Sequence, residues 1–159
     1  MTPRAAVAFA VRAGLLFAGV APFLPAWLAR VPSLRPSGAL LGAWFAFQCE
    51  RDPARMLGFG AVCARCLGLY VGLGLGTLVG ARRVPARWLE RWVALGVVAM
   101  LIDVASEALG WRPAWAPLRV ATGLALGFPA AALVDVALGA WVSGSRARAL
   151  VPGRAAQKP

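Results

Sequence analysis

The side chains that could carry out chemistry gather in one stretch in the first half of the chain. All three cysteines lie there, as Cys49, Cys63 and Cys66, and Glu50 follows the first of them directly. Thiolates and carboxylates are tetrahedral zinc ligands, and a Cys-x-x-Cys spacing is a common way to present two of them. The pattern therefore predicts a site for zinc or another thiolate-binding metal. Its ligands would be Cys49, Cys63, Cys66 and either Glu50 or a carboxylate from a later helix.

Two other interpretations of the cysteines remain open. Cys63 and Cys66 could form a redox pair, because membrane enzymes that make disulfides and pass electrons to quinone also carry a Cys-x-x-Cys near a helix end. Those enzymes use a second cysteine pair as a shuttle, whereas this chain has one further cysteine, Cys49. In the third interpretation the thiols pack as small apolar side chains. The sequence has no histidine, which excludes histidine-ligated haem and histidine-based catalysis.

A pair of carboxylates later in the chain is expected to support the cysteine site. Asp103 and Glu107 lie one helical turn apart and therefore on one helix face. Ionisable groups at membrane depth are costly, so they usually face a protein interior or a water-filled cavity. Buried charges need partners, and Arg65 and Arg119 are the expected partners of these two carboxylates.

The composition is that of a membrane protein rather than a soluble one. Hydrophobic residues make up 60% of the chain and charged residues 14%, against about 25% charged residues in soluble domains. The formal net charge of +11 could indicate a nucleic-acid partner. The arginines, however, lie between apolar runs rather than in one patch, which is typical of basic loops beside lipid headgroups. We therefore expect the lipid bilayer as a partner and no nucleic acid, and we leave open whether copies of the chain form a homo-oligomer.

The apolar runs predict an all-α integral membrane protein with four transmembrane helices, at residues 5–28, 63–80, from about 88 or 92 to 109, and 118–142. Residues 38–47 are too few to span and predict a short re-entrant or interfacial segment before the second helix. Residues 1–142 would form one membrane domain, and 143–159 a basic, disordered cytoplasmic tail.

The first apolar run carries two kinds of interruption. Pro22 and Pro25 should kink or end the helix. Arg12 is expected to lie near the cytoplasmic surface and to extend its guanidinium toward the headgroups. A cleaved signal peptide is the alternative for this run.

Small residues recur every four positions on two of the predicted helices. The second helix carries Gly68, Gly72, Gly76 and Gly80, and the fourth carries Gly123, Gly127, Ala131, Asp135 and Gly139. Such stripes let helix backbones approach each other closely in a membrane, so we expect both faces to be packing surfaces. The second stripe includes a carboxylate, for which Arg82 and Arg146 are the candidate partners.

The distribution of arginines predicts the orientation of the chain. With four transmembrane helices the two termini and the loop at residues 81–91 share one side, and this side carries more Lys and Arg than the other. Because cytoplasmic loops are enriched in these residues, both termini are expected in the cytoplasm. The cysteine stretch, Asp103, Glu107, Arg112 and Arg119 would then converge on the outer side. The composition, rich in alanine, glycine and arginine, suggests a bacterial inner membrane.

With these motifs in place, the chain resembles a known family. Residues 49–55, Gly58 and residues 62–72 are similar to the signature of the small prokaryotic membrane proteins grouped as domain of unknown function 2085. That signature has a Cys-His pair, then proline and arginine, then Cys-Ala-Arg-Cys-Thr-Gly-Ile-Tyr and a glycine-rich helix. Asp103, Leu118–Arg119 and Thr122–Gly123 resemble a later part of the family pattern. The resemblance covers residues 46–127 and implies a multi-pass membrane protein with no established activity.

Two positions depart from the family pattern. Glu50 stands where the family usually has histidine, and Leu67 where it usually has threonine. A mechanism that needs the histidine is therefore not expected here, although Glu50 can still bind a metal or carry a proton.

Overall fold

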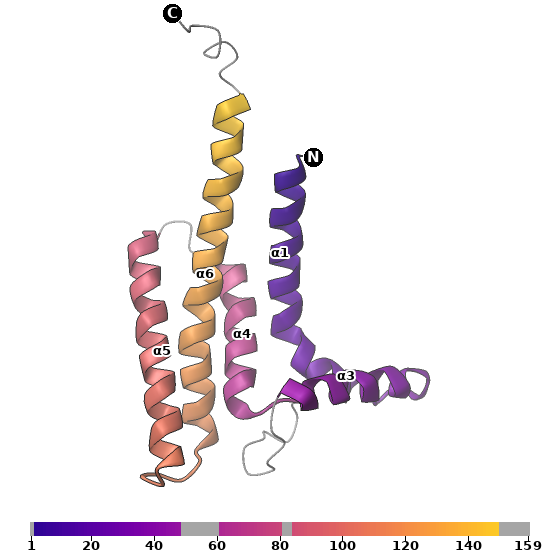
Figure 1. The fold of residues 1–159 in the computed structure, drawn as a ribbon. Coiled ribbons are helices and arrows are strands. Elements are labelled where there is room, and N and C mark those ends of the chain that lie inside the picture. Colours follow the sequence, from indigo (N-terminus) through magenta and orange to yellow (C-terminus); the bar gives the residue numbers. More distant parts are fainter. Residues whose placement is uncertain (1, 49–60, 81–83, 150–159) are drawn as a thin grey trace, which may run out of the picture.

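The computed structural model describes residues 2–48, 61–80 and 84–149, and every regular element within them is a helix. Four helices, α1, α4, α5 and α6, lie alongside one another, and α3 lies at an angle to them and extends outward from the bundle (Figure 1). This confirms the all-α prediction. Two segments, Pro3–Leu28 and Ala116–Gly144, are long and apolar enough to cross a membrane, while the apolar helix Ala64–Val79 is shorter.

The first apolar run bends where its prolines lie. Helix α1 (Pro3–Val20) begins with Thr2 as its N-cap, continues as a short 3-10 turn η1 (Ala21–Phe23), and ends as α2 (Leu24–Leu28). Proline removes a backbone donor and clashes with the preceding turn of a regular helix. The expected kink at Pro22 and Pro25 is therefore present.

The segment before the cysteines is a single helix. After the 3-10 turn η2 (Pro32–Leu34), α3 (Arg35–Gln48) runs roughly perpendicular to α1 and packs on α2 (Figure 1). Its Phe45 is buried, and the ring meets Tyr70 of α4 edge to face with 5.8 Å between centroids, whereas Leu40 and Trp44 are exposed. Residues 35–48 thus form one continuous helix, and the prediction that this segment is interfacial or re-entrant stays a prediction.

Helices α4 (Ala64–Val79) and α6 (Ala116–Ala149) make the largest helix–helix contact in the described residues, and glycine makes it possible. A Cβ atom on Gly72 would stand 2.8 Å from the backbone nitrogen of Phe128, and one on Gly76 would overlap the Phe128 carbonyl oxygen. From the other side, a Cβ atom on Gly127 would overlap the carbonyl oxygen of Leu69. The two backbones touch directly, which is the close approach that small-residue stripes permit.

The fourth glycine of the α4 stripe has a different role from the one expected. Gly80 is the C-cap of α4 and has φ 52, in the left-handed region that side chains with a Cβ atom disfavour. A Cβ atom there would meet Asp135 Oδ2 at 3.8 Å, an ordinary contact distance. Gly80 therefore ends the helix, whereas Gly68, Gly72 and Gly76 provide the close packing.

Two further glycine contacts were not foreseen from the sequence. Gly96 of α5 (Ala86–Ala108) lies against the backbone of Ala125 and Leu126 in α6, and Gly19 of α1 lies against Gly74 of α4. Each glycine stands alone on its face, so no four-residue repeat marks it. Helix α6 continues past residue 142, the expected end of the membrane domain, and ends at Ala149.

Candidate functional site

The N-terminal end of α4, the C-terminal end of α5 and the N-terminal end of α6 meet at one end of the bundle (Figure 1). Asp103 of α5 lies at the centre of this region and is 3% exposed. It accepts hydrogen bonds from Arg65 Nε at 2.8 Å and from Arg65 Nη2 at 2.5 Å, both at Oδ2, and from Arg112 Nη2 at Oδ1. One buried carboxylate thus joins α4 to the loop that follows α5.

The second carboxylate holds α6 in the same way. Glu107 accepts two hydrogen bonds from Arg119, one of them from Nε to Oε2 at 2.8 Å, and Arg65 Nη2 lies 3.4 Å from Oε2. Arg119 is only 1% exposed, so its guanidinium depends on this carboxylate for its charge partner. Arg65 contacts both carboxylates and therefore links the two ion pairs into one network.

Two hydroxyl groups complete the network. Thr122 Oγ1 lies 3.4 Å from Asp103 Oδ2 and donates to the carbonyl of Arg119 at 3.1 Å. Ser106 Oγ accepts from Arg112 Nε at 3.0 Å. Sequence reasoning gave neither hydroxyl a role of its own, although Thr122 is part of the family pattern three residues after Arg119. In the described residues no buried side-chain nitrogen or oxygen lacks a hydrogen-bond partner.

The structure thus brings together five of the residues expected to converge, which are Arg65, Asp103, Glu107, Arg112 and Arg119. We call these five residues the arginine–carboxylate cluster. It holds three guanidinium groups and two carboxylates, so both carboxylates are neutralised by arginine. A carboxylate that is already bound by two guanidinium groups is a poor ligand for a cation, because the positive charges repel the metal.

The cysteines lie beside the cluster but on another face of α4. Cys63 is the N-cap of the helix and Cys66 lies in its first turn, and both are half-buried. Cys66 packs against the apolar cluster of Phe45, Val62 and Leu67 on the side of α3. Arg65, one residue earlier and therefore about 100° around the helix, turns to Asp103 instead.

The complete metal site predicted from the sequence falls partly outside the described residues. Cys49 and Glu50 belong to the stretch 49–60, and Arg82 to 81–83, neither of which is described. Within residues 2–48, 61–80 and 84–149 no three Cys, Asp or Glu side chains come together in a way that could hold a metal ion. Cys63 and Cys66 therefore supply at most two ligands, and the other two would have to come from 49–60 or from outside the chain.

A separate ion pair lies nearer the opposite end of the bundle. Arg12 Nε of α1 donates to Asp135 Oδ1 of α6 at 2.5 Å, and Asp135 is 4% exposed. Arg12 was expected to reach toward the membrane surface and was not considered as a partner for Asp135. The side chains of Arg82 and Arg146, which the sequence suggested as partners of Asp135, are not among those that the structure describes.

Comparison with known proteins identifies related chains without supplying an activity. A family model described as "Predicted membrane protein (DUF2085)" matches residues 49–133. An uncharacterised protein from Methanocaldococcus jannaschii is 29% identical over 99 aligned positions, and the match covers 55% of this chain and 62% of the relative. An uncharacterised protein from Methanothermobacter thermautotrophicus is 31% identical over 99 aligned positions, and the match covers 58% of this chain and 88% of the relative. The chain thus matches less than two thirds of the first relative's length. No solved structure matches the chain.

Proposed function

Because this chain belongs to the DUF2085 family of predicted membrane proteins, we propose that it is a multi-pass membrane protein whose α1, α4, α5 and α6 each cross the bilayer. The antiparallel arrangement of these helices, with the start of α1 and the end of α6 on the same side, supports four crossings (Figure 1). The exposed apolar side chains of α5, such as Leu95, Leu101 and Ile102, would face lipid. In this proposal the arginine-rich side is cytoplasmic, so the cysteines would lie on the outer side. Both relatives are archaeal, so the bacterial inner membrane stays a prediction from composition.

The proposed function is to hold a thiolate-bound metal, with zinc as the first candidate, at the N-terminus of α4 in a binding, sensing or transport role. One observation carries this proposal. Cys63 and Cys66 occupy the N-cap and the first turn of α4, where the positive end of the helix dipole favours thiolates. Two thiolates separated by one helical turn match the Cys-x-x-Cys half of a tetrahedral zinc site.

The arginine–carboxylate cluster narrows the choice of the remaining ligands. Asp103 and Glu107 are occupied by arginines, so we assign them, together with Arg65 and Arg119, to supporting the site. The third and fourth ligands in this proposal are Cys49 and Glu50, which precede α4 in the sequence. Such a set of three thiolates and one carboxylate would carry a net charge of −2 when it binds a divalent cation.

A membrane thiol–disulfide oxidoreductase is the alternative, and the placement of the same two cysteines favours it. A Cys-x-x-Cys pair at a helix N-terminus is the arrangement in which a thiolate is stabilised for exchange with a disulfide. In that case Cys63 and Cys66 would cycle between thiol and disulfide, and Cys49 would contribute little.

The two functions are separated by measuring metal and thiols on the same sample. The full chain, purified in detergent without reductant, should contain about one metal ion per chain and three protected thiols. Changing Cys49, Cys63 or Cys66 to Ser should lower the metal content to a similar degree, and Glu50→Gln should also lower it. Glu107→Gln is the matched control for Glu50→Gln, because it makes the same chemical change at a residue outside the proposed ligand set. Folded Glu107→Gln protein should have a metal content near that of wild type. Absence of metal together with a Cys63–Cys66 disulfide would refute the metal site in favour of the oxidoreductase.

A further inference from the structure

Helix α4 ends before its neighbours do, on the side of the molecule where α1 begins and α6 ends (Figure 1). Its 16 residues extend over about 24 Å at a rise of 1.5 Å per residue, whereas the hydrocarbon core of a bilayer is about 30 Å thick. Gly80 ends the helix, and a Cβ atom there would lie 3.8 Å from Asp135 Oδ2. The C-terminal end of α4 therefore lies at the level of a buried carboxylate of α6.

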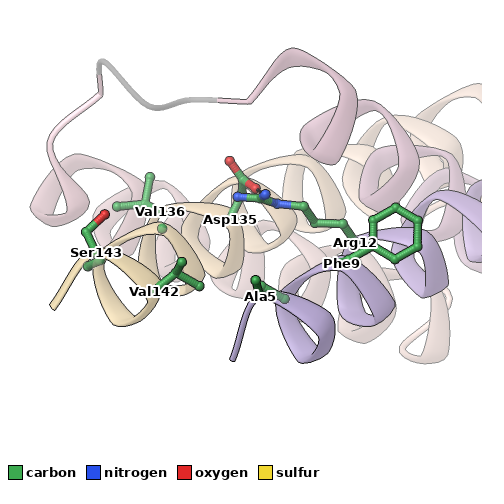
Figure 2. A pocket seen from close by; sticks show the side chains of 10 residues that line it. Ala5, Phe9, Arg12, Asp135, Val136, Val142 and Ser143 are labelled. Carbon is green, nitrogen blue, oxygen red and sulfur yellow. Dashed lines mark hydrogen bonds and ion pairs between the residues drawn. The ribbon is translucent and has the colours of Figure 1, made fainter. Parts of the chain in front are cut away.

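A cavity of about 330 Å³ lies at this end of α4. Its walls are the last turn of α4 with its C-cap, residues 77–80, together with Arg12 of α1 and Asp135 of α6. Figure 2 shows Arg12 reaching from α1 toward Asp135, and Arg12 Nε donates to Asp135 Oδ1 at 2.5 Å. The same two side chains also line a larger cleft of about 610 Å³ between α1 and α6. The two cavities thus meet at the ion pair.

The groups that line the smaller cavity need a polar environment. The last four carbonyl groups of an α-helix have no partner within the helix, and a carbonyl group without a partner is costly in the hydrocarbon of a membrane. Charged side chains at membrane depth usually face a protein interior or a water-filled cavity. Asp135 is 4% exposed, whereas the Arg12 side chain is 32% exposed, so protein atoms alone do not enclose the arginine. Both cavities are large enough for several water molecules, which can satisfy the helix end and the arginine together.

We infer that water fills a vestibule made of these two cavities, which opens on the side proposed to be cytoplasmic and ends at the Arg12–Asp135 ion pair. Toward the other side, Gly72 and Gly76 hold the backbone of α4 directly against α6, which closes the vestibule. Water and small hydrophilic molecules would therefore enter the inner half of the membrane but not cross it between α4 and α6. The inference rests on the proposed crossing of the bilayer by α4 and uses no residue of the thiol site.

The test compares two cysteines introduced near the end of α4. Thr77 lines the smaller cavity, and its hydroxyl donates to the carbonyl of Leu73 in the same helix at 2.8 Å, so this hydroxyl does not hold helices together. Thr77→Cys is therefore a mild substitution inside the vestibule. Leu75→Cys is the matched control, because Leu75 lies two residues earlier, is 41% exposed on the surface of the bundle and lines neither cavity.

The measurement is the rate of labelling by a sulfonated, membrane-impermeant maleimide added to inside-out membrane vesicles that contain the full chain. In the proposed topology the native cysteines lie in the vesicle lumen, and the unsubstituted chain measures any labelling of them. Leu75→Cys should be surrounded by lipid, where the reactive thiolate is disfavoured. Thr77→Cys should therefore react faster by about tenfold or more. Complete labelling of both variants after unfolding in dodecyl sulfate shows that a slow rate reflects protection in the folded chain.

The ion pair is tested in the Thr77→Cys background. Arg12→Met combined with Asp135→Val replaces both charges by apolar side chains of similar volume, a change that buried ion pairs often tolerate. Water should then be lost from the cavity, and the labelling rate of Thr77→Cys should fall toward that of Leu75→Cys. Arg91→Gln removes a charge near the same end but outside both cavities, and it should leave the rate unchanged.

Three results would overturn the inference. Slow labelling at both positions would mean that water does not fill the smaller cavity, and it would leave the crossing of the bilayer by α4 intact. Equally fast labelling at both positions would mean that lipid does not surround α4 at this depth, which would contradict the proposed crossing as well. An unchanged rate in the variant with Arg12→Met and Asp135→Val would mean that the ion pair does not hold the water.

Discussion

At the scale of single residues, Asp103 is a buried carboxylate that connects several segments of the described structure. It is buried, and it accepts from Arg65, Arg112 and Thr122, which come from three different segments. In a low-dielectric environment each guanidinium needs its carboxylate, because an unpaired buried charge is far more costly than the neutral alternative. The role of Asp103 is therefore to hold three segments together, which leaves its carboxylate little capacity for a metal.

This interpretation predicts a large effect of a nearly isosteric change. Asp103→Asn should lower the free energy of unfolding by about 3 kcal/mol, because Arg112 and part of Arg65 lose their charge partner. Thermal unfolding of the detergent-solubilised chain, followed by circular dichroism, measures the change. Glu90→Gln, on the exposed side of the same helix, should stay within about 0.5 kcal/mol of wild type. Removing Arg112 in the Asp103→Asn background, as Arg112→Gln, should restore part of the lost stability.

The cluster prediction fails if Asp103→Asn unfolds at the same temperature as Glu90→Gln. It also fails if Arg112→Gln lowers the free energy of unfolding as much in the Asp103→Asn background as it does in wild type. Such additive effects would show that the two side chains act independently.

At the scale of elements, the contact between α4 and α6 depends on the absence of side chains. Gly68 and Gly76 each face a carbonyl oxygen of α6 so closely that any Cβ atom would overlap it. Membrane helices gain little stability from burying apolar surface against each other, because lipid tails are equally apolar. The stability of their association therefore depends on close van der Waals packing. The glycine stripe is therefore the main determinant of how α4 sits on α6.

A single methyl group is enough to test this contact. Gly76→Ala should destabilise the protein by about 2 kcal/mol, the typical cost of overpacking a tight contact, because the Phe128 backbone has to move away. Gly14→Ala, which meets open space on α1, should be neutral or stabilising by up to about 1 kcal/mol through helix propensity. The measurement is again the unfolding temperature in detergent, and equal effects of the two substitutions would rule out the close contact.

At the scale of the whole molecule, the buried charged side chains of the described residues lie in two regions, nearer opposite ends of the helices. The thiols and the arginine–carboxylate cluster lie where α4 begins and α5 ends, whereas the Arg12–Asp135 ion pair lies nearer the end where α1 begins and α6 ends. Figure 1 shows these two ends of the helices on opposite sides of the bundle. With four crossings these two regions face opposite sides of the membrane. A metal or redox site at the start of α4 would then be separated from the Arg12–Asp135 ion pair by most of the length of α4.

The four-helix topology has a direct test in cysteine-accessibility labelling. In a background without the native cysteines, Val84→Cys and Ser143→Cys should react with a membrane-impermeant reagent only after the cytoplasmic side is exposed. Trp111→Cys, at a position that is 77% exposed between α5 and α6, should react in intact cells. Labelling of Val84→Cys and Trp111→Cys from the same side would contradict four crossings and would remove the assignment of the cysteines to the outer face.

The features that could be predicted from the sequence are those that depend on neighbours along the chain. The helical segments follow from apolar runs, the bend in the first one from Pro22 and Pro25, and the packing face of α4 from glycines four residues apart. The pairing of Arg65 and Arg119 with Asp103 and Glu107 was also predictable. A buried charge needs a partner of opposite sign, and the chain has few acidic groups that could serve. Each of these arguments needs only spacing, length and charge.

Other features were decided only when the helices packed together. Arg12, 123 residues away, donates a hydrogen bond to Asp135. The close contacts of Gly19 with Gly74 and of Gly96 with α6 do not belong to a four-residue glycine repeat. Cys66 packs against the apolar cluster, whereas the adjacent Arg65 binds Asp103. This difference between two neighbouring residues also arises only in the assembled bundle. All of these depend on how far each helix is rotated about its axis and shifted along its neighbour. Rotation and shift are set jointly by every contact in the bundle, so no single stretch of sequence contains them.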